Sequence, residues 1–137
     1  MVFFDSNVLV YVHDQRFPRK REQARRLYAS YLYQDAIALS TQVLQEFFVT
    51  VTRKTSQLSV RDATNLVQQL AGLHMVTIDA DHILAAIDLH SRYQIPFWDS
   101  LILVAAKAAG ATLVLSEDLA HGRIYDGVRV ENPFVTH

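Results

Sequence analysis

The sequence predicts an α/β fold in which helices cover both faces of a mainly parallel sheet. Residues 2–4 and 113–115 are apolar at every position, which is typical of strands that are buried on both faces of a sheet. Between these two runs, further short apolar segments alternate with segments whose apolar residues recur at helical spacing. Strands that alternate with helices are joined by right-handed crossovers and form a parallel sheet.

Five strands are expected, at residues 2–4, 36–39, 75–78, 113–115 and 128–130. Six helices are expected, at residues 8–12, 19–33, 42–54 and 59–71, from Asp79 or Asp81 to Tyr93, and at residues 101–109. Local chemistry sets several boundaries: Pro18 fits the start of a helix, Ser40 or Thr41 and Ser59 are capping residues, and Gly110 ends a helix. The last helix is apolar all round and must be largely enclosed.

Composition narrows the classes of function. The 137 residues are expected to form one domain, residues 1–137, that buries about two-thirds of its unfolded surface. The chain has no cysteine, which excludes disulfides, thiolate metal ligands and cysteine nucleophiles and favours the reducing cytoplasm. It begins without the features of a signal peptide, and no apolar run approaches the roughly 20 residues of a membrane span.

The net charge of −1 gives no general affinity for nucleic acid, but the basic residues are unevenly placed. Six of the thirteen Lys and Arg residues lie within residues 16–26, where Glu22 is the one acid. These residues, with Arg53, are candidate contacts to phosphates. The simpler interpretation is a solvated helix face.

Four acidic residues lie at positions that suit chemistry in such a fold. Asp5 follows the first strand, and Asp118, with Glu117 beside it, follows the strand at residues 113–115. Asp99 stands at the start of the most apolar helix, and Glu46 lies at the margin of the apolar face of its own helix. Each also has a structural explanation, since an aspartate can cap a helix and a glutamate at the edge of a helix is normally solvated.

Convergence of these acids would imply a metal ion. In a parallel sheet the carboxyl ends of the strands lie along one edge, and ligands bind in the crevice outside them. Four carboxylates in one pocket would repel one another and raise one another's pKa unless a cation neutralised them. Oxygen ligands without cysteine or a paired histidine motif favour Mg²⁺ or Mn²⁺ over Zn²⁺. Such a site suits hydrolysis at phosphorus, because the metal activates a water for in-line attack.

Taken in order, the four acidic motifs resemble the PIN domain family, especially the VapC-like toxins of bacterial toxin–antitoxin pairs. The motifs are V-F-F-D-S-N-V-L-V-Y around Asp5, Q-V-L-Q-E-F around Glu46, F-W-D-S-L-I-L-V-A-A around Asp99 and L-V-L-S-E-D-L around Asp118. The closing H-G-R and V-R-V-E-N-P-F segments are similar too. The resemblance extends over the whole chain, and four motifs in order are far more specific than any one of them.

The resemblance implies a three-layer α/β/α PIN-like domain with Mg²⁺- or Mn²⁺-dependent endoribonuclease activity, frequent homodimers and neutralisation by a cognate antitoxin. Carried over by position, the catalytic and metal-binding acids are Asp5, Glu46, Asp99 and Asp118, and the supporting hydrogen-bonding residues are Asn7 and Ser116. The family motif aligns with Asp118 better than with its neighbour Glu117. The expected reaction is hydrolysis of an RNA phosphodiester by activated water without a covalent intermediate. Single-stranded or looped RNA is the expected substrate, since its phosphates can be splayed across a shallow edge.

The antitoxin is expected to lay an amphipathic segment in an apolar groove and to direct a basic side chain into the acidic pocket. Two other functions compete with the nuclease. Phosphatases of the haloacid dehalogenase type also place an aspartate after the first strand, but they need a second aspartate where this chain has Asn7. A PIN-like module that binds RNA or protein without cleavage is the other alternative, and the presence of all four acids argues against it.

Overall fold

The computed structural model describes residues 1–53 and 58–135, and these residues form a six-stranded sheet with helices packed on it. The strands are β1 (Val2–Phe4), β2 (Ile37–Ser40), β3 (His74–Val76), β4 (Leu113–Leu115), β5 (Ile124–Tyr125) and β6 (Val128–Glu131). The helices are α1 (Ser6–Tyr11), α2 (Pro18–Tyr33), α3 (Thr41–Val51), α4 (Val60–Ala71), α5 (Ala80–Tyr93) and α6 (Phe97–Ala108). The sheet order is β3-β2-β1-β4-β6-β5, and every pair is parallel except β5 with β6.

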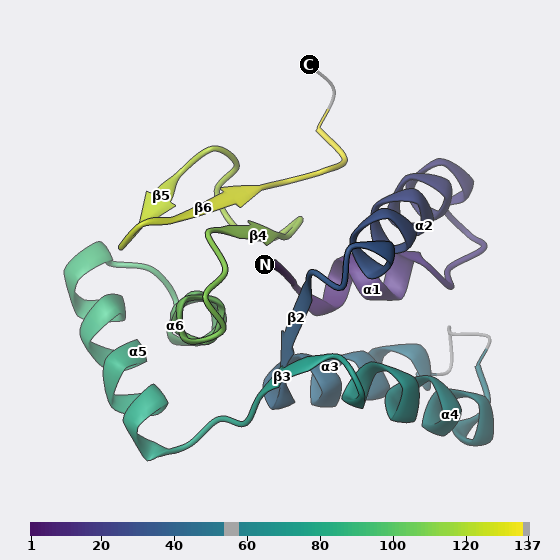
Figure 1. Ribbon diagram of the computed structural model, residues 1–137, viewed down its shortest axis with the longest axis horizontal. Coiled ribbons are helices and arrows are strands. Elements are labelled where there is room, and N and C mark those ends of the chain that lie inside the picture. The colour runs from purple at the N-terminus through teal and green to yellow at the C-terminus, as the bar shows by residue number, and fades with distance from the viewer. Residues whose placement is uncertain (54–57, 136–137) are drawn as a thin grey trace.

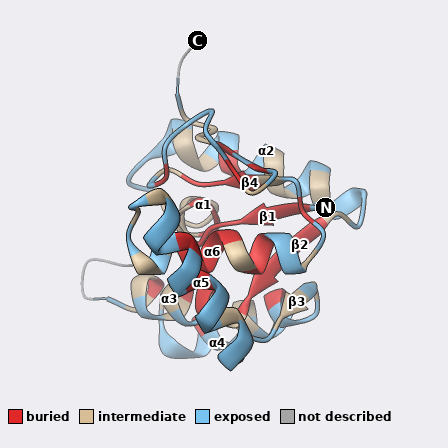
Figure 2. Ribbon diagram, turned by 90° about the vertical axis from the view of Figure 1, so that its left-hand side faces the viewer, coloured by how far each residue is buried: buried red, intermediate tan, exposed pale blue. Residues whose placement is uncertain are grey.

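The helices lie in two layers around the sheet. Figure 1 shows α5 and α6 on one side of the sheet and α1 to α4 on the other. The strand β1 is central, and Phe3 and Phe4 are both fully buried, as Figure 2 shows for the middle of the fold. The three-layer α/β fold that the sequence predicts is therefore confirmed. The apolar helix α6 is largely enclosed, as expected, with Leu103 only 1 % exposed.

The pairing of β1 aligns three strand ends. Phe3 lies opposite Ala38 of β2 and Val114 of β4, so the carboxyl ends of these strands are side by side. The backbone N–H of Asp5 then donates to the carbonyl of Leu115 at 3.0 Å, which extends the pairing by one residue. The residues that follow β1, β2 and β4 are thereby brought to one edge of the sheet.

Several expected boundaries are also confirmed. Ser40 and Ser59 cap α3 and α4 through their hydroxyls, and Asp79, not Asp81, caps α5. Pro18 is the first residue of α2. The expected end of α3 at Lys54 is wrong: the helix ends at Val51, with Thr52 as its C-cap, and Lys54 itself lies outside the described residues.

Several ends shift by one to three residues, as at α1, which begins at Ser6, and at β3, which ends at Val76. Two larger features also differ from the expectation. Helix α6 begins at Phe97, directly after Pro96, so Asp99 lies in the first turn and is not a capping residue. The cause is local: Pro96 is extended, and its carbonyl accepts hydrogen bonds from both the backbone N–H and the hydroxyl of Ser100. The sequence interpretation also missed β5, a strand of two residues. The sequence signal for this strand was the pair Asp126-Gly127, which is typical of a tight hairpin turn. In the structure both residues have the positive φ angles that such a turn requires.

No helix among the described residues is long and apolar enough to cross a membrane.

Phe4 is expected to anchor α2 to the sheet, because its ring meets Tyr28 and Tyr31 edge-on at 6.2 and 6.0 Å between centroids. Replacing Phe4 with Ala is expected to lower the free energy of unfolding by about 3–5 kcal/mol, since the site is fully buried and would leave a cavity. Urea unfolding followed by circular dichroism measures this. Tyr33→Ala is the control, because Tyr33 is 93 % exposed, and it is expected to change stability by less than about 0.5 kcal/mol. Equal effects of the two substitutions would contradict the packing argument.

Candidate functional site

Asp5 stands at the centre of the carboxyl edge of the sheet. It is the N-cap of α1 and is only 6 % exposed. One carboxylate oxygen accepts the backbone N–H of Ser6 at 2.7 Å, and the other accepts the hydroxyl of Ser116 at 2.7 Å. Both hydrogen bonds hold the carboxylate in one orientation at the end of β1.

Glu46 reaches this edge from the second turn of α3. Its Oε2 accepts the hydroxyl of Ser6 at 3.0 Å, and its Oε1 accepts the side-chain amide of Gln42 at 2.8 Å. The same Gln42 amide also donates to the carbonyl of Trp98 at 3.3 Å, which ties α3 to the start of α6. Gln42 is buried, and sequence reasoning missed it because its role is a tertiary contact that no motif records.

Asp118 is fixed by two residues that sequence analysis had picked as supporting ones. The amide of Asn7 donates to Asp118 Oδ2 at 3.0 Å, and the Asn7 carbonyl oxygen accepts the backbone N–H of Glu117 at 3.1 Å. The hydroxyl of Ser116 accepts the backbone N–H of Asp118 at 3.2 Å. The segment after β4 is thus joined to the first turn of α1.

The side chain of Glu117 has different hydrogen-bond partners from the side chain of Asp118. Its carboxylate accepts the phenol of Tyr11 at 2.8 Å and the ammonium of Lys20 at 2.6 Å. The Lys20 ammonium also lies 4.9 Å from the ring centroid of Tyr11 and 5.5 Å from that of Phe134. The charge of Glu117 is therefore neutralised within the fold, whereas that of Asp118 is not paired with a cation among the residues described.

Electrostatics join the four acids. Burial raises the pKa of Asp5 to about 6, against the lowering effect of its hydrogen bonds from Ser116 and Ser6, and the charges of Glu46 and Asp118 raise it further. Burial also raises the pKa of Asp99, and the charges of Asp118 and Glu46 add to that rise. The charges of Glu46 and Asp118 therefore act on the carboxyl groups of both Asp5 and Asp99, which places the four acids near one another.

The side chains do not by themselves form a closed metal centre. Within residues 1–53 and 58–135, no group of three or more His, Cys, Asp or Glu side chains is arranged so that it could hold a metal ion. The chemistry of the donor set nevertheless suits a hard cation, because mutually repelling carboxylates are the ligands that Mg²⁺ and Mn²⁺ prefer. Of these acids, Asp118 is exposed and Asp99 is half-buried.

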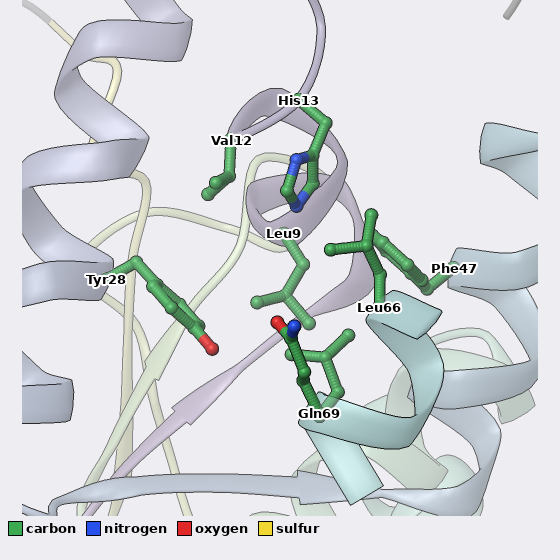
Figure 3. Close-up of a pocket in the computed structure, with 8 residues that line it drawn as sticks. Leu9, Val12, His13, Tyr28, Phe47, Leu66 and Gln69 are labelled. Carbon is green, nitrogen blue, oxygen red and sulfur yellow. The ribbon is translucent and has the colours of Figure 1, made fainter. Parts of the chain in front are cut away.

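A separate apolar cavity opens among α1, α2, α3 and α4, as Figure 3 shows. Its lining residues are Leu9, Val12, His13, Tyr28, Phe47, Leu66, Gln69 and Leu70. The cavity has a volume of about 60 Å³, which would hold about four water molecules or one aliphatic side chain. It is mainly apolar, so it suits an apolar group better than a polar ligand.

The raised pKa of Asp5 leads to a prediction about stability. Its pKa is about 6 in the fold against an ordinary value of 3.8, so between about pH 4 and 6 the folded chain holds a proton that the unfolded chain releases. Stability is therefore lost as the pH rises through this window. In the absence of divalent metals, Asp5→Asn is expected to be up to about 3 kcal/mol more stable than the native chain at pH 7 and to match it near pH 4.

Urea unfolding in EDTA at several pH values between 4 and 7 tests this prediction. Asp81→Asn is the matched control, because Asp81 is an exposed aspartate of α5, and the difference from the native chain should then be small at every pH. An Asp5→Asn variant that is less stable than the native chain at pH 7 would show that the two hydrogen bonds outweigh the cost of burial.

Comparison with known proteins agrees with this architecture. Among solved structures, a Mycobacterium tuberculosis VapC20 toxin described as cleaving the sarcin–ricin loop is 19 % identical, with a TM-score of 0.68 over 86 % of this chain and 92 % of that one. A toxin–antitoxin complex from Klebsiella pneumoniae is 16 % identical, with a TM-score of 0.70 over 98 % of each chain. A DNA-bound VapBC from Salmonella typhimurium is 15 % identical, with a TM-score of 0.68 over 96 % of this chain and 97 % of that one.

At these identities the solved structures establish the fold alone. A search of curated proteins found no match. The family profile described as PIN domain matches residues 2–127, which span β1 to the turn after β5 and include all four acids. The chain therefore belongs to the PIN domain family.

Proposed function

We propose that this PIN domain is a metal-dependent endoribonuclease and the toxin of a toxin–antitoxin pair. The observation that carries the proposal is the buried carboxylate of Asp5, whose ionisation is opposed by burial and by the charges of Glu46 and Asp118. A fold gains nothing in stability from concentrating negative charge in this way. The arrangement is explained if a divalent cation and a phosphate occupy the edge during function.

The residues that would hold the cation are Asp5, Glu46, Asp99 and Asp118. A bound Mg²⁺ or Mn²⁺ would supply an activated water and would stabilise the charge that develops on the phosphate and on the leaving oxygen. The neighbouring residues orient the acids: Ser116 holds Asp5, and Asn7 holds Asp118. Such orientation by hydrogen-bonding neighbours typically changes metal affinity or activity 10- to 100-fold.

The site is open enough for a polymer. Asp118 is exposed and Asp99 is half-buried, so a phosphodiester can reach them without entry into a closed cavity. Trp98, next to Asp99, is 65 % exposed, and its carbonyl accepts a hydrogen bond from Gln42, the partner of Glu46. Single-stranded or looped RNA fits such a site, because its backbone can be splayed out and its bases can stack on an aromatic ring.

Cleavage of a mixed cellular RNA pool tests the activity. The native chain is expected to cut RNA in Mg²⁺ or Mn²⁺ and not in EDTA. Asp5→Asn, which keeps the shape and removes the charge, is expected to lower the rate at least about 100-fold. Asp81→Asn, whose aspartate is exposed on α5, is the control and should keep the native rate.

Other outcomes separate the competing functions. Retained RNA binding with no cleavage in any metal would favour a binding module. A trapped acyl-phosphate on Asp5 would favour a phosphatase of the haloacid dehalogenase type, although Asn7 stands where that chemistry needs an aspartate. Cleavage that survives in EDTA would contradict the metal requirement.

The apolar cavity of Figure 3 is proposed as the place where the antitoxin docks an apolar side chain. Support comes from the lining of Leu9, Phe47 and Leu66, and from solved structures of similar fold, among them a toxin–antitoxin complex and a DNA-bound VapBC. A segment bound here would reach the acidic edge along α1, whose N-terminus is capped by Asp5 and whose C-terminal end lies beside the cavity. The homodimer and the cytoplasmic location remain predictions.

Leu66→Gln is expected to leave cleavage intact and to weaken antitoxin binding about tenfold or more, because a polar group would replace the apolar wall of the cavity. Val49→Gln is the control, since Val49 is 51 % exposed on α3 and does not line the cavity. The readout is growth of cells that express each toxin variant together with the partner, followed by measurement of the dissociation constant. Full neutralisation of the Leu66→Gln toxin would place the antitoxin elsewhere.

A further inference from the structure

The fold divides the basic cluster of residues 16–26 into paired and unpaired members. Arg16 pairs with Asp14 at 2.8 Å, Lys20 with Glu117 at 2.6 Å, and Arg26 with Glu22 at 2.6 Å. Within the described part of the chain, no ion pair joins Arg21 or Arg25 to a carboxylate. Part of the positive charge of the cluster is therefore neutralised within the fold, and the charges of Arg21 and Arg25 are not.

Arg21 and Arg25 lie one turn apart on α2 and line the same open groove. The groove is also lined by Gln15, Pro18 and Ala29, and by Glu22 and Arg26, whose charges pair with each other. The Nε of Arg21 is buried and has no hydrogen-bond partner among the residues that the structure describes. This guanidinium thus retains hydrogen-bonding capacity that the described fold does not use, which is uncommon for a partly buried polar group.

His13 indicates how closely these charges converge. Burial lowers the pKa of His13, and the positive charges of Arg25 and Arg21 lower it further. His13 lies just after α1, so the two arginines of α2 are near the C-terminal end of that helix. Helix α1 therefore spans the distance between the groove and the acidic edge, where Asp5 caps its N-terminal end.

A second connection runs through Lys20, the neighbour of Arg21. Lys20 binds Glu117, which is adjacent to Asp118, so the first turn of α2 lies directly beside the acidic edge. A strand of RNA is a polyanion, and four carboxylates at the edge repel it. Positive charge next to the edge is needed to offset that repulsion while one phosphate is held for cleavage.

We propose that Arg21 and Arg25 form a subsite for RNA backbone phosphates on one side of the phosphate that is cut. The inference rests on the proposed nuclease function. A guanidinium is planar and binds a phosphate through two parallel hydrogen bonds, so two arginines one helical turn apart can hold successive phosphates. The contacts are to the backbone, and the subsite therefore positions RNA without reading its sequence.

Binding of a fluorescently labelled single-stranded RNA tests the subsite. All variants carry Asp5→Asn, so that RNA is bound and not cut. Arg21→Gln with Arg25→Gln is compared with Arg19→Gln with Arg61→Gln, which removes the same charge from exposed positions outside the groove. Loss of two phosphate contacts should weaken binding about 20-fold at 0.1 M salt and reduce the slope of log K against log[salt] by about 1.4. The control pair should change affinity less than about threefold.

Three results would overturn the subsite. The first is an equal loss of RNA affinity in the Arg21/Arg25 variant and the Arg19/Arg61 variant. The second is an unchanged salt slope in the Arg21/Arg25 variant. The third is unchanged RNA affinity in that variant together with loss of binding to an acidic protein segment. Cleavage by the chain with native Asp5 separates this inference from the proposed function. Cleavage that persists while the groove pair binds RNA normally refutes only the subsite, whereas groove-dependent binding with no cleavage in any metal refutes only the nuclease.

Discussion

The structure depends on the burial of one carboxylate, that of Asp5, at the end of the central strand. Burial costs free energy because a carboxylate leaves water, and the two hydrogen bonds from Ser6 and Ser116 only partly offset that cost, since the pKa of Asp5 is still about 6. These two donors also connect to the other acids: the Ser6 hydroxyl binds Glu46, and the Ser116 hydroxyl binds the backbone of Asp118. The geometry of the whole acidic edge is therefore set from Asp5 outward.

The topology of the sheet explains why the acidic edge is centred on Asp5. From β1 the chain adds β2 and β3 on one side of the sheet and later β4 and β6 on the other. Strand order changes direction at β1, and a crevice opens where the connections leave a parallel sheet toward opposite faces. Asp5 lies at the floor of this crevice, with the segment after β4 beside it. Helix α6 lies on the opposite face of the sheet from α3, and it brings Asp99 toward the same crevice.

The sequence predicted the parts of the site that depend on strand order, because strand ends and helix starts are local signals. Asp5 and Asp118 were placed at the edge from the apolar runs before them, and the structure puts them there. Asp99 was placed correctly at the edge but in the wrong local role, since Pro96, three residues before it, makes the helix begin at Phe97. Gln42 and the pairing of Glu117 with Lys20 could not be predicted, because they join segments 56 and 97 residues apart in the chain.

The pairing of Lys20 shows how charge is divided between the acids and the basic helix. If Glu117 were unpaired, a fifth negative charge would lie beside Asp118, and the repulsion that already raises the pKa of Asp5 and Asp99 would increase. Lys20 removes that charge, with Tyr11 as a second donor to the same carboxylate. Its neighbour Arg21, about 100° further around the helix, is left free of any carboxylate within the described residues. One turn of α2 thus neutralises Glu117 through Lys20 and leaves Arg21 available to an external anion.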